Sequence, residues 1–306
     1  MEFIGVGWRG GRQRTETSSG VRAWFRPAQP RLADHMKTKT GAVISLAVLI
    51  VLGPLRAVEP PLLVTQAHAH NDYMHERPLF DALDHGFCSV EADIYLVDGE
   101  LLVAHERRQV KPGRTLQALY LDPIRERVKR YHGSVYSGGP EFTLLIDLKQ
   151  DWHTLYPALR NVLTNYADML TTFSDRAKRS NAVLVIITGN RNEAMFAGET
   201  VRYAAYDGEL SDLETNPPAL LVPWISANWS SRFHWNGAGT MPEAELGRLK
   251  AIVAQAHEQG RRVRFWGAPD NPNFWQAIYA AGVDLINTDN LAGVAQFFLD
   301  RRKQAR

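Results

Sequence analysis

The feature that most constrains the fold is a regular alternation, from residue 62 onward, of short apolar runs with amphipathic helical patterns. Apolar runs of five to eight residues are typical of buried strands, and apolar residues every three or four positions are typical of helices. Strands that alternate with helices imply right-handed crossovers and a parallel sheet. We predict strands over residues 62–67, 87–96, 142–148, 182–188, 220–225, 262–266 and 283–287, a hairpin strand over 101–104, and a further candidate strand over 201–206.

The number of these units favours a closed α/β barrel of the (β/α)8 TIM type over an open, doubly wound sheet. Residues 58–306 comprise 249 residues, which matches the usual size of such a barrel. The sequence contains neither an interdomain linker pattern nor a glycine-rich dinucleotide or phosphate-loop motif. We therefore expect one barrel domain over residues 58–306.

The first 57 residues differ from this pattern. Residues 1–35 are rich in Arg, Gly, Pro, Ser and Thr and lack a helical or strand period, so we expect an unstructured extension or a mis-assigned start. Residues 36–57 combine a basic start with a short apolar core, which predicts a signal peptide and an exported protein, periplasmic or extracellular. The alternative is a membrane anchor over residues 41–53.

The charge of the chain depends on its beginning. Residues 58–306 hold 26 of the 35 basic and 30 of the 33 acidic residues, so their net charge is −4, although the whole chain carries +2. This part contains no basic stripe or RNA-binding motif, so we expect no nucleic-acid partner. The one cysteine, Cys88, excludes an internal disulfide and lies in an apolar context typical of a core thiol.

Acidic residues stand inside apolar strands. Glu91 and Asp93 are two positions apart in one predicted strand, so their side chains point to the same face. Asp147 and Lys149 repeat this spacing in the next long strand. Burying neighbouring carboxylates is costly unless a cation compensates them, and Mg²⁺ or Ca²⁺ prefers carboxylate oxygens. We predict one divalent cation held by Glu91, Asp93 and Asp147, with Lys149 beside an anionic substrate; the alternative is that Glu91 and Asp93 form ordinary ion pairs with Lys149 and an arginine.

Two histidines also fall next to predicted strands. His70 follows the first strand, and His105 follows the hairpin strand. Catalytic groups of a closed barrel gather at the carboxyl ends of the strands. An imidazole titrates near neutral pH, so the pair can act as general base and general acid on opposite sides of a scissile phosphate.

These motifs together resemble a known group of enzymes. The pattern of His70, Glu91-x-Asp93, His105 and Asp147-x-Lys149 is similar to the glycerophosphodiester phosphodiesterase and phosphatidylinositol phospholipase C superfamily, whose members share a barrel fold. The segments AHNDYMHERPLFDAL, GFCSVEADIYLVDGELLVAH and TLQALYLDPI resemble the branch of the altered inheritance of mitochondria protein. The Asp147-x-Lys149 form and the segment RFWGAPDNPNFWQAIYAAGVDLINTDN are also similar to sphingomyelinase D.

The resemblance implies a metal-dependent phosphodiester hydrolase. It assigns acid–base catalysis to His70 and His105, the cation to the three carboxylates, and substrate contacts to Lys149 and Trp266. Asn71 replaces the arginine of the His-Arg-Gly motif of the superfamily, and we include it among the predicted substrate-binding residues. We expect a monomer that acts on a glycerophosphodiester or phospholipid-type substrate, with transient contact to a membrane surface. The sequence leaves open whether the product is a monoester or a cyclic phosphate.

Two other functions compete with this interpretation. A metal-dependent amidohydrolase would use His68, His70 and Asp289, but residues 182–190 and 220–227 lack the histidines that such a site requires. A catalytically inactive barrel could bind a lipid or a sugar through aromatic side chains near the strand ends, which are equally consistent with packing between barrel and helices. These aromatic residues are Trp224, Trp229, Phe233, Trp235, Trp266 and Trp275.

Overall fold

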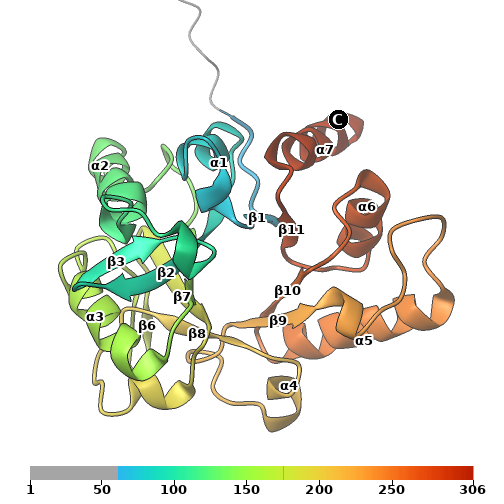
Figure 1. Cartoon of the computed structure of the whole chain (residues 1–306). Helices are drawn as coiled ribbons and strands as arrows, with labels where there is room; N and C mark the ends of the chain where they lie inside the picture. Colours follow the sequence, from blue (N-terminus) through green and yellow to red (C-terminus); the bar gives the residue numbers. More distant parts are fainter. Residues whose placement is uncertain (1–60, 175, 306) are drawn as a thin grey trace, which may run out of the picture. The chain divides into compact units, whose positions relative to one another are not determined.

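The computed structural model describes residues 61–174 and 176–305, and Figure 1 follows the chain from blue to red. The predicted extension at 1–35, the predicted signal peptide at 36–57 and the alternative anchor at 41–53 lie outside these residues. Within the described part, none of the helices combines the length and the apolar character that a membrane span requires.

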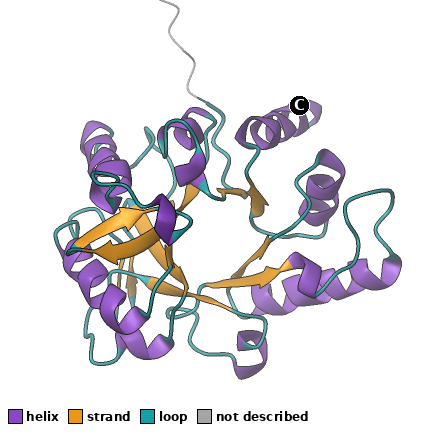
Figure 2. Cartoon of the chain, viewed as in Figure 1, coloured by secondary structure: helices purple, strands orange, loops and turns teal. Residues whose placement is uncertain are grey.

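Eight parallel strands of the described residues follow one another around a single sheet, with helices outside them (Figures 1 and 2). In order around the sheet they are β1 (Ala67–Ala69), β2 (Ser89–Val97), β4 (Phe142–Leu148), β7 (Val183–Gly189), β8 (Ala205–Gly208), β9 (Trp224–Asn228), β10 (Arg262–Trp266) and β11 (Ile286–Thr288). Strand β11 pairs with β1, and a parallel bridge joins Arg264 of β10 to Leu285, just before β11. The sheet closes on itself, so the predicted (β/α)8 barrel is confirmed.

Three short strands add two hairpins. Strand β3 (Glu100–Val103) runs antiparallel to β2, as the Asp98-Gly99 turn predicts. Strands β5 (Thr172–Phe173) and β6 (Lys178–Arg179) pair only with each other as strands. The first hairpin carries the chain from β2 to His105 at the rim of the barrel.

Helices of very different length connect the strands. The α-helices are α1 (Phe80–Asp84), α2 (Asp122–Arg130), α3 (Trp152–Thr164), α4 (Asp212–Thr215), α5 (Glu243–Glu258), α6 (Pro272–Ala280) and α7 (Leu291–Gln304). Single turns occur at η1 (Asp72–Met74), η2 (Arg107–Gln109), η3 (Gln117–Leu121), η4 (Glu193–Phe196) and η5 (Trp229–Ser231). Side-chain oxygens of Asp151, Asn271 and Asn290 accept backbone N–H bonds in the first turns of α3, α6 and α7, which explains where these helices begin.

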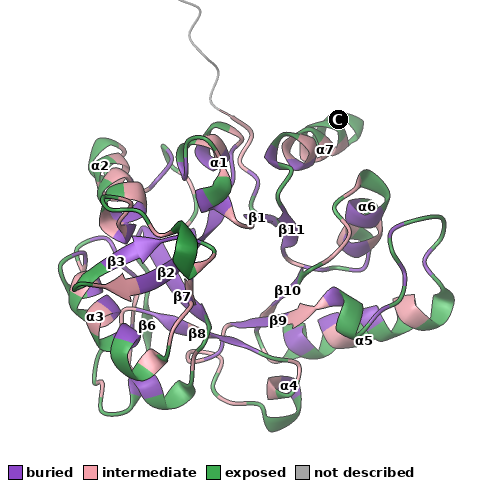
Figure 3. Cartoon of the chain, in the orientation of Figure 1, coloured by how far each residue is buried: buried purple, intermediate pink, exposed green. Residues whose placement is uncertain are grey.

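The interior of the barrel changes from apolar to polar along the strands. A small apolar cluster fills it on the amino-terminal side; its members are Leu145, Phe173, Leu184, Ile186, Ala205, Trp224 and Leu285. Two positions further along β4, β8 and β9, the inward side chains are Asp147, Asp207 and Ser226. A larger apolar cluster packs the strands against the helices, and the strands are almost wholly buried in Figure 3. The polar site therefore lies at the carboxyl ends of the strands, next to the small apolar cluster that fills the barrel interior.

Several predicted strand boundaries were wrong, including that of the last strand, which begins at Ile286 and not at 283. The first strand is Ala67–Ala69 rather than 62–67, with only an isolated bridge at Val64, so His68 lies inside the strand. The apolar residues 220–223 form a turn, because Leu221 and Val222 donate N–H bonds to the carbonyl of Pro218; β9 begins at Trp224. The candidate strand at 201–206 is β8, shifted toward the carboxyl terminus.

Candidate active site

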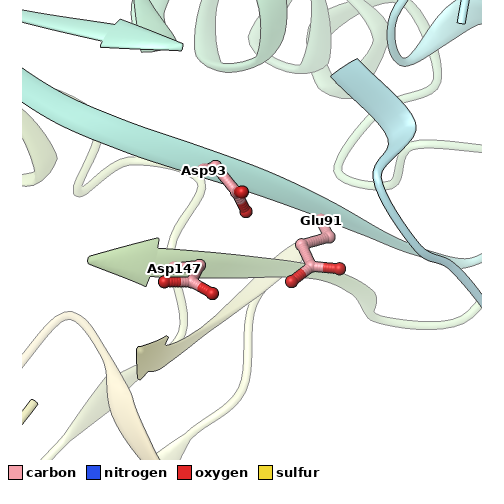
Figure 4. A group of neighbouring side chains, drawn as sticks. All are labelled: Glu91, Asp93 and Asp147. Carbon is pink, nitrogen blue, oxygen red and sulfur yellow. The ribbon is translucent and has the colours of Figure 1, made fainter. Parts of the chain in front are cut away.

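Three carboxylates converge where β2 and β4 lie side by side. Glu91 and Asp93 project from the same face of β2, and Asp93 is paired in register with Asp147 of β4. Each contributes a carboxylate oxygen, and these atoms all lie within 4.8 Å of one another. Figure 4 shows the three side chains turned toward a common space. The structure thus brings together the three predicted metal ligands, which we call the carboxylate side of the site.

The carboxylate side carries charge that its surroundings do not fully compensate. Burial, followed by the charges of Glu91 and Asp147, raises the pKa of the Asp93 carboxyl to about 7. Burial likewise raises the pKa of Asp147. Burial also opposes ionisation of Glu91, but His68, His70 and Arg264 outweigh it and hold the pKa of Glu91 well below its ordinary value. Among the described residues, Oδ1 of Asp93 is buried without a hydrogen-bond partner.

Lys149 lies between two of these carboxylates. Its Nζ is 2.8 Å from Oδ2 of Asp93 and 2.9 Å from Oδ2 of Asp147. The alternative of ordinary ion pairing is therefore realised for Asp93, but in the described residues no lysine or arginine pairs with Glu91. One ammonium against three carboxylates leaves a deficit of positive charge. The three oxygen donors and the unpartnered Oδ1 of Asp93 fit a hard divalent cation.

An acidic residue, Asp289, orients the imidazole of His70. Its Nδ1 lies 2.9 Å from Oδ1 of Asp289, just beyond β11, and 2.9 Å from the amide nitrogen of Asn71. A carboxylate only accepts hydrogen bonds, so Nδ1 carries the proton, and the amide of Asn71 then donates to Asp289 (3.3 Å) and not to Nδ1. Nε2 of His70 lies 3.8 Å from Oε2 of Glu91. Burial opposes charge on this imidazole, but the bond to Asp289 and the charge of Glu91 outweigh it and raise the pKa of His70.

His105 lies across the carboxylates on the hairpin that follows β2. Its Nδ1 is 3.1 Å from Oδ2 of Asp93 and 3.0 Å from the hydroxyl of Tyr73, and about half of its side chain is exposed. The Tyr73 hydroxyl also lies 2.5 Å from Oδ2 of Asp93 and 2.7 Å from Oδ1 of Asn71. Both histidines are thus oriented through Nδ1, and each leaves Nε2 for other contacts. The Tyr73 hydroxyl contacts Asn71, which lies beside His70, and Asp93, which lies beside His105.

A cavity of about 760 Å³ opens over these residues. Seven of the eight predicted site residues line it, whereas Asp93 lies below its surface. The predicted residues that line it are His70, Asn71, Glu91, His105, Asp147, Lys149 and Trp266. Trp266 is 43% exposed, but the other five aromatic residues of the inactive-barrel hypothesis are buried: Trp224 fills the barrel interior, and the remaining four belong to the cluster between barrel and helices.

The opposite wall of the cavity carries a second polar group. Arg264 of β10 donates to Oγ of Ser226 on β9 (3.0 Å), and its Nη2 lies 3.4 Å from Oδ2 of Asp207 on β8. Ser226 donates to Oδ1 of Asp207 (2.7 Å). We call Asp207, Ser226 and Arg264 the arginine side of the site. All three are buried, and all three line the cavity.

The family comparisons agree with this geometry. Residues 57–207 match the model of the AIM6-like phosphodiesterase domain, and residues 262–292 match that of the glycerophosphoryl diester phosphodiesterase family. Altered inheritance of mitochondria protein 6 from Eremothecium gossypii is 30% identical over 272 residues, covering 76% of this chain and 69% of the relative. The protein of the same name from Zygosaccharomyces rouxii is 30% identical and covers 73% and 67%. The chain belongs to the altered inheritance of mitochondria protein 6 family.

Solved structures are more distant from this family member. A glycerophosphodiester phosphodiesterase from Parabacteroides distasonis is 15% identical, with a TM-score of 0.47 and coverage of 78% of this chain and 98% of that chain. An enzyme of the same name from Agrobacterium tumefaciens is 16% identical, with a TM-score of 0.47 and coverage of 76% and 99%. The family comparisons confirm the predicted resemblance to the phosphodiesterase superfamily and to this branch, so the chain carries a phosphodiesterase-type domain.

Several residues of this site were not predicted from the sequence. Tyr73, Asp207 and Arg264 gave no signal beyond their place near strand ends, and Asp289 was considered only for the amidohydrolase. His68, which the amidohydrolase alternative would use as a ligand, lies fully buried with Nδ1 2.7 Å from Oγ of Ser89. Burial lowers the pKa of His68 to about 4. Within the described residues, the group that could hold a metal contains three carboxylates and no histidine, which disfavours the amidohydrolase.

Proposed function

We propose that this protein is a divalent-metal-dependent phosphodiester hydrolase. The observation that supports the proposal most strongly is the position of the three carboxylates of β2 and β4 between two imidazoles, at the floor of one cavity. A phosphodiesterase-type family supports the same reaction class. The proposed substrate is a small-molecule or lipid phosphodiester, and the protein acts after export and as a monomer.

Glu91, Asp93 and Asp147 would hold the cation, because they offer oxygen donors and a buried, unpartnered Oδ1. When bound, a Mg²⁺ or Ca²⁺ ion supplies positive charge that offsets the phosphate and the negative charge that develops on it. The ammonium of Lys149 offsets the repulsion between the carboxylates of Asp93 and Asp147, and it adds a fixed positive charge to the same wall of the cavity.

His70 and His105 divide the proton transfers. The bond from Nδ1 of His70 to Asp289 fixes the imidazole so that Nε2 faces the site. Asp93 and Tyr73 fix His105 in the same way. One Nε2 removes the proton of the attacking hydroxyl, and the other delivers a proton to the leaving oxygen. The attacking hydroxyl belongs to water or to the substrate, which gives a monoester or a cyclic phosphate.

The test is turnover of bis-p-nitrophenyl phosphate by the full chain with Mg²⁺, with Ca²⁺ or with EDTA. We expect turnover with metal only, and a loss of about a hundredfold or more in Asp93→Asn and His105→Ala. Asp98→Asn, in the exposed turn that follows Asp93 on the same hairpin, is the matched control and should leave turnover unchanged. Turnover that persists in EDTA, or that survives both substitutions, would contradict the proposal; phosphorus NMR of a diester panel then identifies substrate and product.

A further inference from the structure

The cations around the cavity are not equivalent. Lys149, Arg191, Arg232 and Arg264 line it. The ammonium of Lys149 is already shared by Asp93 and Asp147. Asn71, the neighbour of His70, contributes no charge. The carboxylate side therefore offers no uncommitted cation of its own to an anionic substrate.

Arg264 is the cation that the barrel holds most firmly. Three neighbouring strands supply its partners: Nε donates to Ser226 (3.0 Å), Nη1 to Oδ1 of Asn287 (3.1 Å), and Nη2 approaches Asp207 (3.4 Å). Its relative exposure is only 3%, yet it borders the cavity. The guanidinium is thus fixed in place before any ligand arrives.

The hydrogen-bonding capacity of Arg264 is not exhausted by these partners. A guanidinium has five N–H donors, and the three contacts account for one on each nitrogen. Among the described residues, one N–H of Nη1 and one N–H of Nη2 are left without a partner. Two such donors in one plane match two oxygens of a phosphate group.

The charge of Arg264 reaches the reaction centre. It contributes to lowering the pKa of Glu91 and opposes protonation of His70 and His68. It also favours the ionised form of Asp147. Arg264 therefore acts electrostatically on groups of β1, β2 and β4, across the barrel from its own strand.

We propose that Arg264 binds the phosphate of the substrate through its two remaining N–H groups, from the wall opposite the carboxylate side. This inference rests on the proposed phosphodiesterase function. It makes Arg264 a substrate-binding residue, and it makes Asp207 the residue that limits the positive charge offered to the phosphate. Ser226 and Asn287 position the guanidinium.

The test measures inorganic phosphate binding to the full chain by calorimetry in the presence of Mg²⁺. Arg264→Lys keeps the charge but loses the planar pair of donors, and we expect phosphate affinity to fall about tenfold to a hundredfold. Arg261→Lys is the matched control: Arg261 is equally buried (2%) but bonds to the carbonyls of Val222 and Pro217 and does not line the cavity. It should leave phosphate affinity unchanged.

A second variant keeps the inference testable if Arg264→Lys does not fold. Asp207→Asn retains Arg264 and removes its negative partner, so phosphate should bind several-fold more tightly. Unchanged or weaker binding in Asp207→Asn, undiminished binding in Arg264→Lys, or no phosphate binding by the wild-type protein would each overturn the inference. Phosphate binding needs no turnover, so a protein that binds phosphate through Arg264 but cleaves no diester would contradict only the proposed function.

Discussion

The two sides of the cavity handle buried charge in opposite ways. On the carboxylate side, Glu91, Asp93 and Asp147 face one lysine, and Asp93 keeps a buried oxygen without a partner among the described residues. On the arginine side, Asp207 is balanced by Arg264 and accepts a hydrogen bond from Ser226. An unbalanced group indicates where an external ion belongs, and a balanced group forms a prepared surface. This difference is why we propose separate binding places for the cation and the phosphate in one barrel.

Among substitutions outside the carboxylate side, the largest effect should come from Asp289, which orients His70. Asp289→Asn replaces the carboxylate, which can only accept, by an amide whose NH2 group can donate to Nδ1, so the Nδ1–H tautomer is no longer enforced; we expect turnover to fall about a hundredfold while the fold is kept. Steady-state kinetics on bis-p-nitrophenyl phosphate measures the change. Asp284→Asn is the control, because Asp284 contacts His257 at 2.8 Å and lies outside the cavity, and the amide oxygen of Asn can still accept the N–H bond that Val263 donates to Asp284. Equal losses in both variants would mean that the Asp289 contact has no special role.

The next effect tests how closely β7 constrains the carboxylate side. Gly189 has φ +80°, and a Cβ there would overlap Oδ1 of Asp147, so Gly189→Ala must displace that carboxylate. We expect cation affinity to fall about tenfold or more, measured by calorimetric titration of Ca²⁺ or Mg²⁺. Gly198→Ala shares the same φ of +80° but meets no neighbouring atom, so it isolates the backbone strain. An unchanged cation affinity in Gly189→Ala would show that Asp147 is not a ligand.

A smaller effect is expected from the tyrosine between the two histidines. Tyr73→Phe removes one hydroxyl that contacts Asp93, Asn71 and His105, and turnover should fall about tenfold through loss of orientation. Tyr95→Phe is matched, because in the described part of the chain its hydroxyl donates to a backbone carbonyl, that of His105 (3.2 Å), and to no side chain. If the two variants behave alike in kinetic assays, Tyr73 contributes nothing specific to the side chain of His105.

The last prediction concerns folding stability and its dependence on pH, which are measured on a scale separate from turnover. Burial raises the pKa of the Asp72 carboxyl, beside the carboxylate side, to about 7. The folded protein then binds a proton that the unfolded chain releases near pH 4, so this group stabilises the fold at low pH and the stabilisation is lost as pH rises toward 7. As pH rises across that window, the free energy of unfolding of the wild type should fall relative to that of Asp72→Asn by on the order of 1 kcal/mol per pH unit. Urea denaturation at several pH values measures the difference; parallel curves would contradict the assignment.

The carboxylate side could be predicted because its information is local in the sequence. Glu91 and Asp93 share a face of one long apolar strand, and consecutive strands of an alternating chain lie side by side. The arginine side could not, because Asp207 and Ser226 lie on the two strands whose positions were misjudged. The apolar run before β9 looks like a strand in the sequence, but prolines interrupt it, so the start of β9 was misplaced. The partners of Arg264 could not be predicted because they depend on the register between strands. Tyr73 reaches the site only because Asn71 adopts a left-handed conformation, φ 49°, before η1.

The central claim is that the carboxylate side holds a divalent cation. The most direct measurement is calorimetric titration of Mg²⁺ or Ca²⁺ into metal-stripped full-length protein, for the wild type and for Glu91→Gln. We predict one binding site per chain in the wild type, and its loss in Glu91→Gln, since Glu91 is the carboxylate of the three that forms no ion pair with a lysine or arginine of the described residues. A wild-type protein that binds neither ion, or a variant that binds as tightly as the wild type, would contradict the claim.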